Sequence, residues 1–95
     1  MASTKGIVEY RLTDHAEVEM RRRQIDEVDV AGVLGAPEQR EAVRKGREVF
    51  QSRREMGDPP RTYLLRVFVD TDRKPPVVVT VYRTSNIAKY WRAEL

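Results

Sequence analysis

The sequence predicts an α+β domain with two short N-terminal helices packed on one face of a four-stranded antiparallel sheet. Up to Pro37 the chain carries helix caps and helical spacing, and beyond it the apolar residues alternate with period two between turn residues. Short connections favour pairing of consecutive strands. Helices segregated to one side of an antiparallel sheet define the α+β class.

The 95 residues are expected to form a single domain, residues 1–95. Residues 1–6 should be a frayed N-terminus, residues 7–91 the folded core and residues 92–95 a tail. Within the core, Ile7–Leu12 alternates roughly between polar and apolar residues. It is either a short edge strand or an extended lead-in to the first helix.

The first helix is predicted to begin at Thr13 or Asp14 and to end near Arg23. Asp14 with Glu17 three residues later has the pattern of a capping box, and Thr13 is the alternative cap. Two apolar residues spaced by four then give the helix a narrow apolar stripe.

A second helix is predicted to begin after Asp26, a favourable capping residue followed by further acids in the first turn. Its apolar residues, between Val28 and Leu34, are spread nearly all round the helix. This spread predicts a short and well-buried helix. Gly35 and Pro37 end it.

Four strands follow, joined by turns at Lys45-Gly46, Met56–Pro60 and Thr71–Pro76. The strand after the second turn alternates strictly, which predicts that Leu65 and Arg66 face opposite sides of the sheet. The last part, Ser85–Leu95, is a polar tail with room for one helical turn folded back on the sheet. The expected strands are Gln39–Val43, Glu48–Arg54, Thr62–Asp70 and Val77–Thr84.

Composition narrows the function classes. The net charge is +3, and 14 of the 18 basic residues are arginine, whose planar fork of donors suits phosphate; a GC-rich genome is the alternative explanation. With no cysteine and one histidine, neither a disulfide nor an ordinary zinc site is expected, and no cofactor motif is present. Apolar runs are too short for a membrane span, so we expect a cytoplasmic protein.

His15 is the first candidate for chemistry. It lies in the first turn of a predicted helix, where the helix dipole disfavours the imidazolium form. A neutral imidazole can act as a general base. The alternative is an exposed histidine near a cap with no role.

Arginines that point from the predicted strands are the second candidate. If several share one sheet face, they form a positive platform for a phosphate backbone. Thr84 at a strand end could hold a phosphate together with the preceding arginine. The alternative is a solvated face partly neutralised by Glu48 and Glu55. The four arginines are Arg47, Arg53, Arg66 and Arg83.

Aromatic residues near cations form the third candidate. Tyr82, Tyr90 and Trp91 lie close in sequence to Arg83 and Lys89, and such a mixture can stack unpaired RNA bases. The alternative is that Tyr90 and Trp91 cap the small core.

Three segments resemble a known family. They are His15-Ala16 followed by Met20, Arg23 and Ile25; Gly46 three residues before Val49-Phe50; and Val79–Ser85 with Lys89-Tyr90-Trp91. Their order and spacing are similar to the domain of unknown function 4258 family, small bacterial proteins and toxin-associated domains. The resemblance implies a RelE/barnase-like fold and a site lined by His15, Arg23, Arg83, Thr84 and Lys89. Glu19 stands where the family tends to have a basic residue; it would orient His15 but repel a phosphate.

The leading hypothesis is therefore a small metal-independent ribonuclease of toxin type with an acidic antitoxin as partner. His15 would act as general base or acid, Arg83 and Arg23 would stabilise charge on the phosphate, and Thr84 would position it. The resemblance adds Lys89 as a source of charge. Arg23, Arg66, Lys89 and Tyr90 are the expected substrate-binding residues. A second hypothesis is a non-catalytic domain that binds RNA or protein through a basic sheet face. A homodimer formed through Trp91 and the strand edges is the third.

Overall fold

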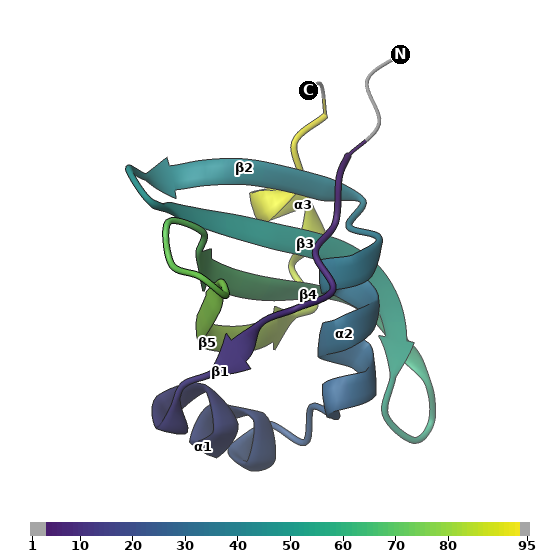
Figure 1. Ribbon diagram of the computed structural model, residues 1–95. Helices are drawn as coiled ribbons and strands as arrows, with labels where there is room; N and C mark the ends of the chain where they lie inside the picture. The colour runs from purple at the N-terminus through teal and green to yellow at the C-terminus, as the bar shows by residue number, and fades with distance from the viewer. Residues whose placement is uncertain (1–3, 94–95) are drawn as a thin grey trace.

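The computed structural model describes residues 4–93, so the first three residues of the predicted frayed terminus and residues 94–95 of the predicted tail lie outside it. Figure 1 shows two helices in front of a sheet and a third short helix behind it. The elements in chain order are β1 (Arg11–Leu12), α1 (Asp14–Arg22), α2 (Glu27–Gly35), β2 (Gln39–Arg44), β3 (Arg47–Met56), β4 (Arg61–Asp70), β5 (Val77–Thr84) and α3 (Ile87–Tyr90).

Both predicted N-terminal helices are present. Of the two capping candidates for α1, Thr13 is the residue that caps, because its hydroxyl accepts a hydrogen bond from the Ala16 N–H at 3.0 Å. Helix α2 begins after Asp26, whose side chain makes no capping hydrogen bond. It is less completely buried than its sequence predicted, since Val28 is 75% exposed while Val30 is fully buried.

The predicted α+β class is correct, but the prediction for the sheet was wrong. The sheet has five strands in the order β1-β5-β4-β3-β2 and is mixed, not four-stranded and antiparallel. Strand β1 pairs in parallel with β5, while β2 to β5 pair antiparallel in sequence order. Of the two alternatives for Ile7–Leu12, the short edge strand is therefore correct, but only over Arg11–Leu12. This strand, β1, and the residue after it bind β5 through the Arg11 N–H, which donates to Pro76 O, and the Thr13 N–H, which donates to Val78 O. They thereby supply backbone partners to the outer edge of β5, which would otherwise be an open strand edge.

The two faces of the sheet differ. The face toward α1 and α2, here called the helix face, contributes Phe50, Leu65, Val67 and Val81 to a single buried core. The opposite face, here called the far face, carries the alternate residues of the same strands. It includes Gln51 of β3 and, through the aligned register, Arg66 and Tyr82.

The C-terminal segment, residues 85–93, turns back across the far face. After β5 it forms the single turn α3, which lies behind the sheet in Figure 1, on the side away from α1 and α2. Two fully buried apolar residues, Val49 and Leu64, point to this face and are not part of the core cluster under the helices. The far face is therefore a covered surface and not an open platform.

Candidate functional site

The structure divides the predicted site residues between two surfaces. His15 and Arg23 lie at α1, and Arg83 shares the helix face with Leu65, its partner in the register. Thr84 follows Arg83 and therefore points to the far face, where Arg66 also lies. Lys89 and Tyr90 belong to α3 behind the sheet. One site containing all seven residues is not formed.

On the α1 side, His15 is exposed and Arg23 is engaged by a carboxylate. The Arg23 Nε lies 2.8 Å from Glu19 Oε1, and Arg22 Nη1 lies 3.0 Å from Glu19 Oε2. The hydrogen bond from Arg23 is the largest cause that lowers the pKa of Glu19 below its ordinary value. Since Glu19 stays ionised, it compensates the charge of Arg23, which leaves less of that charge for a phosphate.

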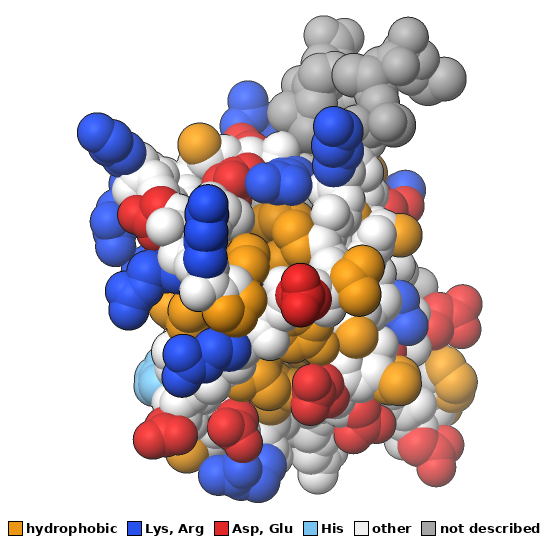
Figure 2. All heavy atoms as spheres, viewed as in Figure 1, with side chains coloured by type: hydrophobic (Ala, Val, Ile, Leu, Met, Phe, Trp, Pro, Cys, Tyr) orange, Lys and Arg blue, Asp and Glu red, His pale blue; other side chains and the backbone are white. Residues whose placement is uncertain are grey.

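The surface around α1 and α2 is mixed in charge. Figure 2 shows this side of the molecule, with acidic side chains along the lower part, where the helices lie, and basic side chains mainly to the left and above. The first turns of the two helices contribute Asp14, Glu17, Glu27 and Asp29. A polyanion that approaches α1 would therefore meet carboxylates as well as His15.

Arg83 has no ion pair within the described chain. Its guanidinium carbon lies 4.7 Å from the centre of the Tyr63 ring, a cation–π contact on the helix face. Its hydrogen-bond donors are therefore available to an anion approaching the edge of the helix face.

On the far face, Arg66 is a buried charged residue that forms no ion pair within residues 4–93. Only 9% of the residue is exposed, yet its hydrogen bonds go to neutral partners: Nε donates to Gln51 Oε1 at 2.8 Å and Nη1 donates to Tyr82 Oη at 2.6 Å. A buried cation without a counter-charge is costly in free energy, which makes this group a candidate for binding an anion.

Three aromatic rings surround this guanidinium. Its carbon lies 4.4 Å from the ring centre of Tyr90, 5.3 Å from that of Phe68 and 5.7 Å from that of Tyr82. Phe68 and Tyr82 stack with ring centres 6.0 Å apart, and all three rings are half-buried. We call Arg66, Phe68, Tyr82 and Tyr90 the Arg66 cluster.

The other strand arginines do not add to this cluster. Arg47 lies on the far face but pairs with Asp70, with Nε 2.6 Å from Oδ1. Arg53, on the same face, pairs with Glu38 at 2.9 Å and covers the Trp91 ring at 4.1 Å. These hydrogen bonds are the largest causes that lower the pKa values of Asp70 and Glu38. The predicted platform of four arginines is thus not formed, because one member lies on the helix face and two others are already neutralised.

Thr84 and Lys89 have local contacts. The Thr84 hydroxyl accepts a hydrogen bond from the Asn86 N–H at 3.0 Å, which stabilises the turn into α3. The Lys89 ammonium lies 5.3 Å from the Tyr90 ring centre, beside the Arg66 cluster. Lys89 therefore adds positive charge to that cluster, whereas the described contacts of Thr84 are structural.

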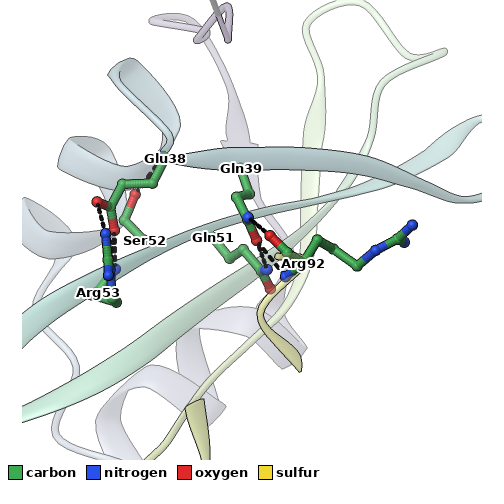
Figure 3. A network of polar contacts seen from close by, with 6 residues as sticks. All are labelled: Glu38, Gln39, Gln51, Ser52, Arg53 and Arg92. Atoms are coloured by element: carbon green, nitrogen blue, oxygen red, sulfur yellow. Dashed lines mark hydrogen bonds and ion pairs between the residues drawn. The ribbon is translucent and has the colours of Figure 1, made fainter. Parts of the chain in front are cut away.

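The sequence did not identify Gln39 and Gln51 as residues of the far-face site. Their amides form a buried network on the far face, in which Gln51 Nε2 donates to Gln39 Oε1 at 2.7 Å (Figure 3). The only signal in the sequence was that two polar residues stand at inward positions of strands. Phe68 was also missed as a site residue, although the alternation places it on the face of Arg66.

Two classes of site are not found. Within residues 4–93, no group of three or more His, Asp or Glu side chains is arranged to hold a metal ion. None of the helices in that range is long and apolar enough to cross a membrane.

Comparison with known proteins identifies a family. The family model described as Domain of unknown function (DUF4258) matches residues 12–83, from β1 to the penultimate residue of β5. The search of curated proteins and the search of solved structures each find no match. Because the family match covers most of its 95 residues, the chain belongs to the DUF4258 family.

Proposed function

We propose that this protein binds single-stranded RNA through Arg66 and the neighbouring rings of Phe68 and Tyr82. The observation that carries the proposal is a guanidinium, nine-tenths buried, that has only neutral hydrogen-bond partners in the described chain. A phosphate would supply the missing negative charge by charge-assisted hydrogen bonds. Half-buried aromatic rings next to that phosphate site offer stacking surfaces for unpaired bases.

The charge of the chain supports the same proposal. The whole chain carries a net charge of +3, which attracts a polyanion over long range. A single strand fits better than a duplex because stacking on Phe68 and Tyr82 requires bases that are not already paired.

Fluorescence anisotropy with a labelled single-stranded RNA of about 12 nucleotides tests the proposal. We expect binding at about 50 mM salt, clearly weaker binding at about 200 mM salt, and weaker binding of a duplex of the same length. The buffer contains EDTA, so that divalent ions play no part. If the single strand fails to bind at the lower salt, or binds no better than the duplex, the proposal is wrong.

A second candidate function is metal-independent RNA cleavage at α1, as in ribonuclease toxins of the RelE/barnase type. The observation that favours it is that His15 is exposed while Arg83, on the same side of the sheet, has no carboxylate partner in the described chain. His15 would remove the proton of a 2′-hydroxyl and Arg83 would stabilise the phosphate charge. Under this second proposal the protein would be a bacterial toxin that acts in the cytoplasm and is inhibited by an acidic antitoxin.

We expect the variant His15→Ala to separate the two functions. If His15 is the general base, cleavage of total RNA in EDTA falls by about 100-fold or more, while RNA affinity changes less than about twofold. Glu17→Ala, another exposed substitution on α1, is the matched control and should cleave like the wild type. Equal cleavage by all three proteins would point to a contaminating nuclease and would remove His15 from the mechanism.

A further inference from the structure

The C-terminal segment is held on the far face by side-chain amides that bind its backbone. Gln39 Nε2 donates to Arg92 O, and Gln39 Oε1 accepts from the Arg92 N–H at 3.1 Å (Figure 3). Gln51 Nε2 also donates to Tyr90 O, at 3.1 Å. Gln39 thus binds both backbone groups of one residue, as a neighbouring strand would.

The same network reaches Arg66. Gln51 accepts from Arg66 through Oε1 and donates through Nε2 to both Gln39 and Tyr90. Gln51 is 1% exposed, so these bonds form away from water. The position of the C-terminal segment and the surroundings of the Arg66 guanidinium are therefore linked through one side chain.

The segment also covers Arg66 directly. The Tyr90 ring is the aromatic ring nearest to the guanidinium, at 4.4 Å, and it occupies space that a base or phosphate would need. At the exposed rim of the segment, Trp91 lies under Arg53 and Arg92 forms an ion pair with Glu41, a type of contact that contributes little to stability.

Several features would allow the segment to detach without disrupting the sheet. Helix α3 has four residues, none of them buried, and no side-chain cap. The segment is not a strand of the sheet, so its release breaks no strand ladder. Local openings of this kind cost less free energy than global unfolding.

We infer that residues 87–93 form an autoinhibitory strap over the RNA site, with Gln39 and Gln51 as its latch. This inference rests on the proposed RNA binding at Arg66. With the strap closed, Tyr90 and its amide partners shield the guanidinium. With the strap open, Arg66, Gln51 and the rings of Phe68 and Tyr82 are free to contact a single strand. RNA affinity is then set by the fraction of molecules whose strap is open.

Variants of the latch test the inference. Gln39→Met keeps the length of the side chain but removes the donor and the acceptor that hold Arg92. We expect single-stranded RNA to bind about tenfold more tightly, because two hydrogen bonds of the closed state are lost. Arg92→Pro removes the N–H from the strap side and should act in the same direction. Glu41→Gln, which weakens only the exposed ion pair, is the control, with a change below about twofold.

Hydrogen exchange provides a second readout that does not depend on RNA. The Arg92 amide should exchange faster in Gln39→Met than in the wild type, while amides of β3 and β4 keep their protection. Retained protection in those strands also shows that the variant is folded.

The outcomes separate failure of the strap from failure of RNA binding. If the wild type binds RNA and the latch variants bind equally or more weakly, the closed segment does not hinder binding and the strap inference is wrong. If neither the wild type nor any latch variant binds, the proposed function itself fails. An Arg92 amide that exchanges at the same rate in Gln39→Met would show that Gln39 is not the latch.

Discussion

The variant Arg66→Met is expected to bind single-stranded RNA at least about tenfold more weakly than the wild type. A charge-assisted hydrogen bond contributes about 1.5–3 kcal/mol, and each 1.4 kcal/mol corresponds to a factor of about ten in affinity. The slope of log affinity against log salt should fall by about 0.7, the value for one phosphate contact on a single strand. Anisotropy titrations over a series of salt concentrations measure both quantities.

We do not expect the weaker RNA binding of Arg66→Met to come from unfolding of the variant. Methionine is two bonds shorter than arginine, but it is flexible and apolar, and its sulfur would make favourable contacts with the rings of Phe68 and Tyr90 that surround this position. Removing a buried cation that has no counter-charge in the described chain offsets the loss of its two hydrogen bonds to Gln51 and Tyr82. We therefore expect a melting temperature close to that of the wild type.

Arg61→Met is the matched control for this experiment. Arg61 lies on the same strand, β4, but is exposed and points to the helix face. The substitution removes the same charge from the chain as a whole. If Arg61→Met weakens RNA binding as much as Arg66→Met does, net charge and not the Arg66 cluster determines binding. Arg66→Lys should retain part of the affinity, because it keeps the charge but loses the fork of donors.

Local patterns predicted most of the fold. Capping residues placed both helices, and strict alternation in Thr62–Asp70 correctly assigned Leu65 to the core and Arg66 to the other face. The pairing of β1 could not be predicted in the same way. A strand of two residues is too short to show an alternation of polar and apolar residues, and its parallel partner β5 lies far along the chain. The pairing depends on how the two helices pack against the sheet, which the local sequence does not reveal.

The candidate site was predicted only in part, for two different reasons. Arg83 and Thr84 are adjacent in one strand, so the alternation that assigned Arg66 also places their side chains on opposite faces of the sheet. The expectation that both would line one site disagreed with this alternation, which was already visible in the sequence. Gln39 and Gln51 stand at inward positions of their strands, but nothing in the sequence indicates that they bind the C-terminal segment. These glutamines bind the backbone of residues 90 and 92, and backbone groups are the same whatever the side chain.

The variant Phe50→Ala is expected to destabilise the protein more than Phe68→Ala, the corresponding truncation on the far face. Phe50 is fully buried in the core between the sheet and the helices, and Arg40 covers its ring at 4.5 Å. Truncation of a buried phenylalanine costs about 3–5 kcal/mol, against a total of about 5–15 kcal/mol for a domain. The melting temperature should fall by roughly 15 °C or more, as measured by circular dichroism.

Phe68 provides the comparison, because the chain has two phenylalanines and they lie on opposite faces of the sheet. Phe68 is half-buried and stacks on Tyr82, so Phe68→Ala should cost only about 1–2 kcal/mol. It should nevertheless weaken RNA binding, since it removes a stacking surface beside Arg66. Such a result would show that Phe50 on the helix face contributes mainly to stability, whereas Phe68 on the far face contributes mainly to RNA binding. Equal loss of stability in the two variants would show that the far face is a second core, and its aromatic residues would need no ligand to explain them.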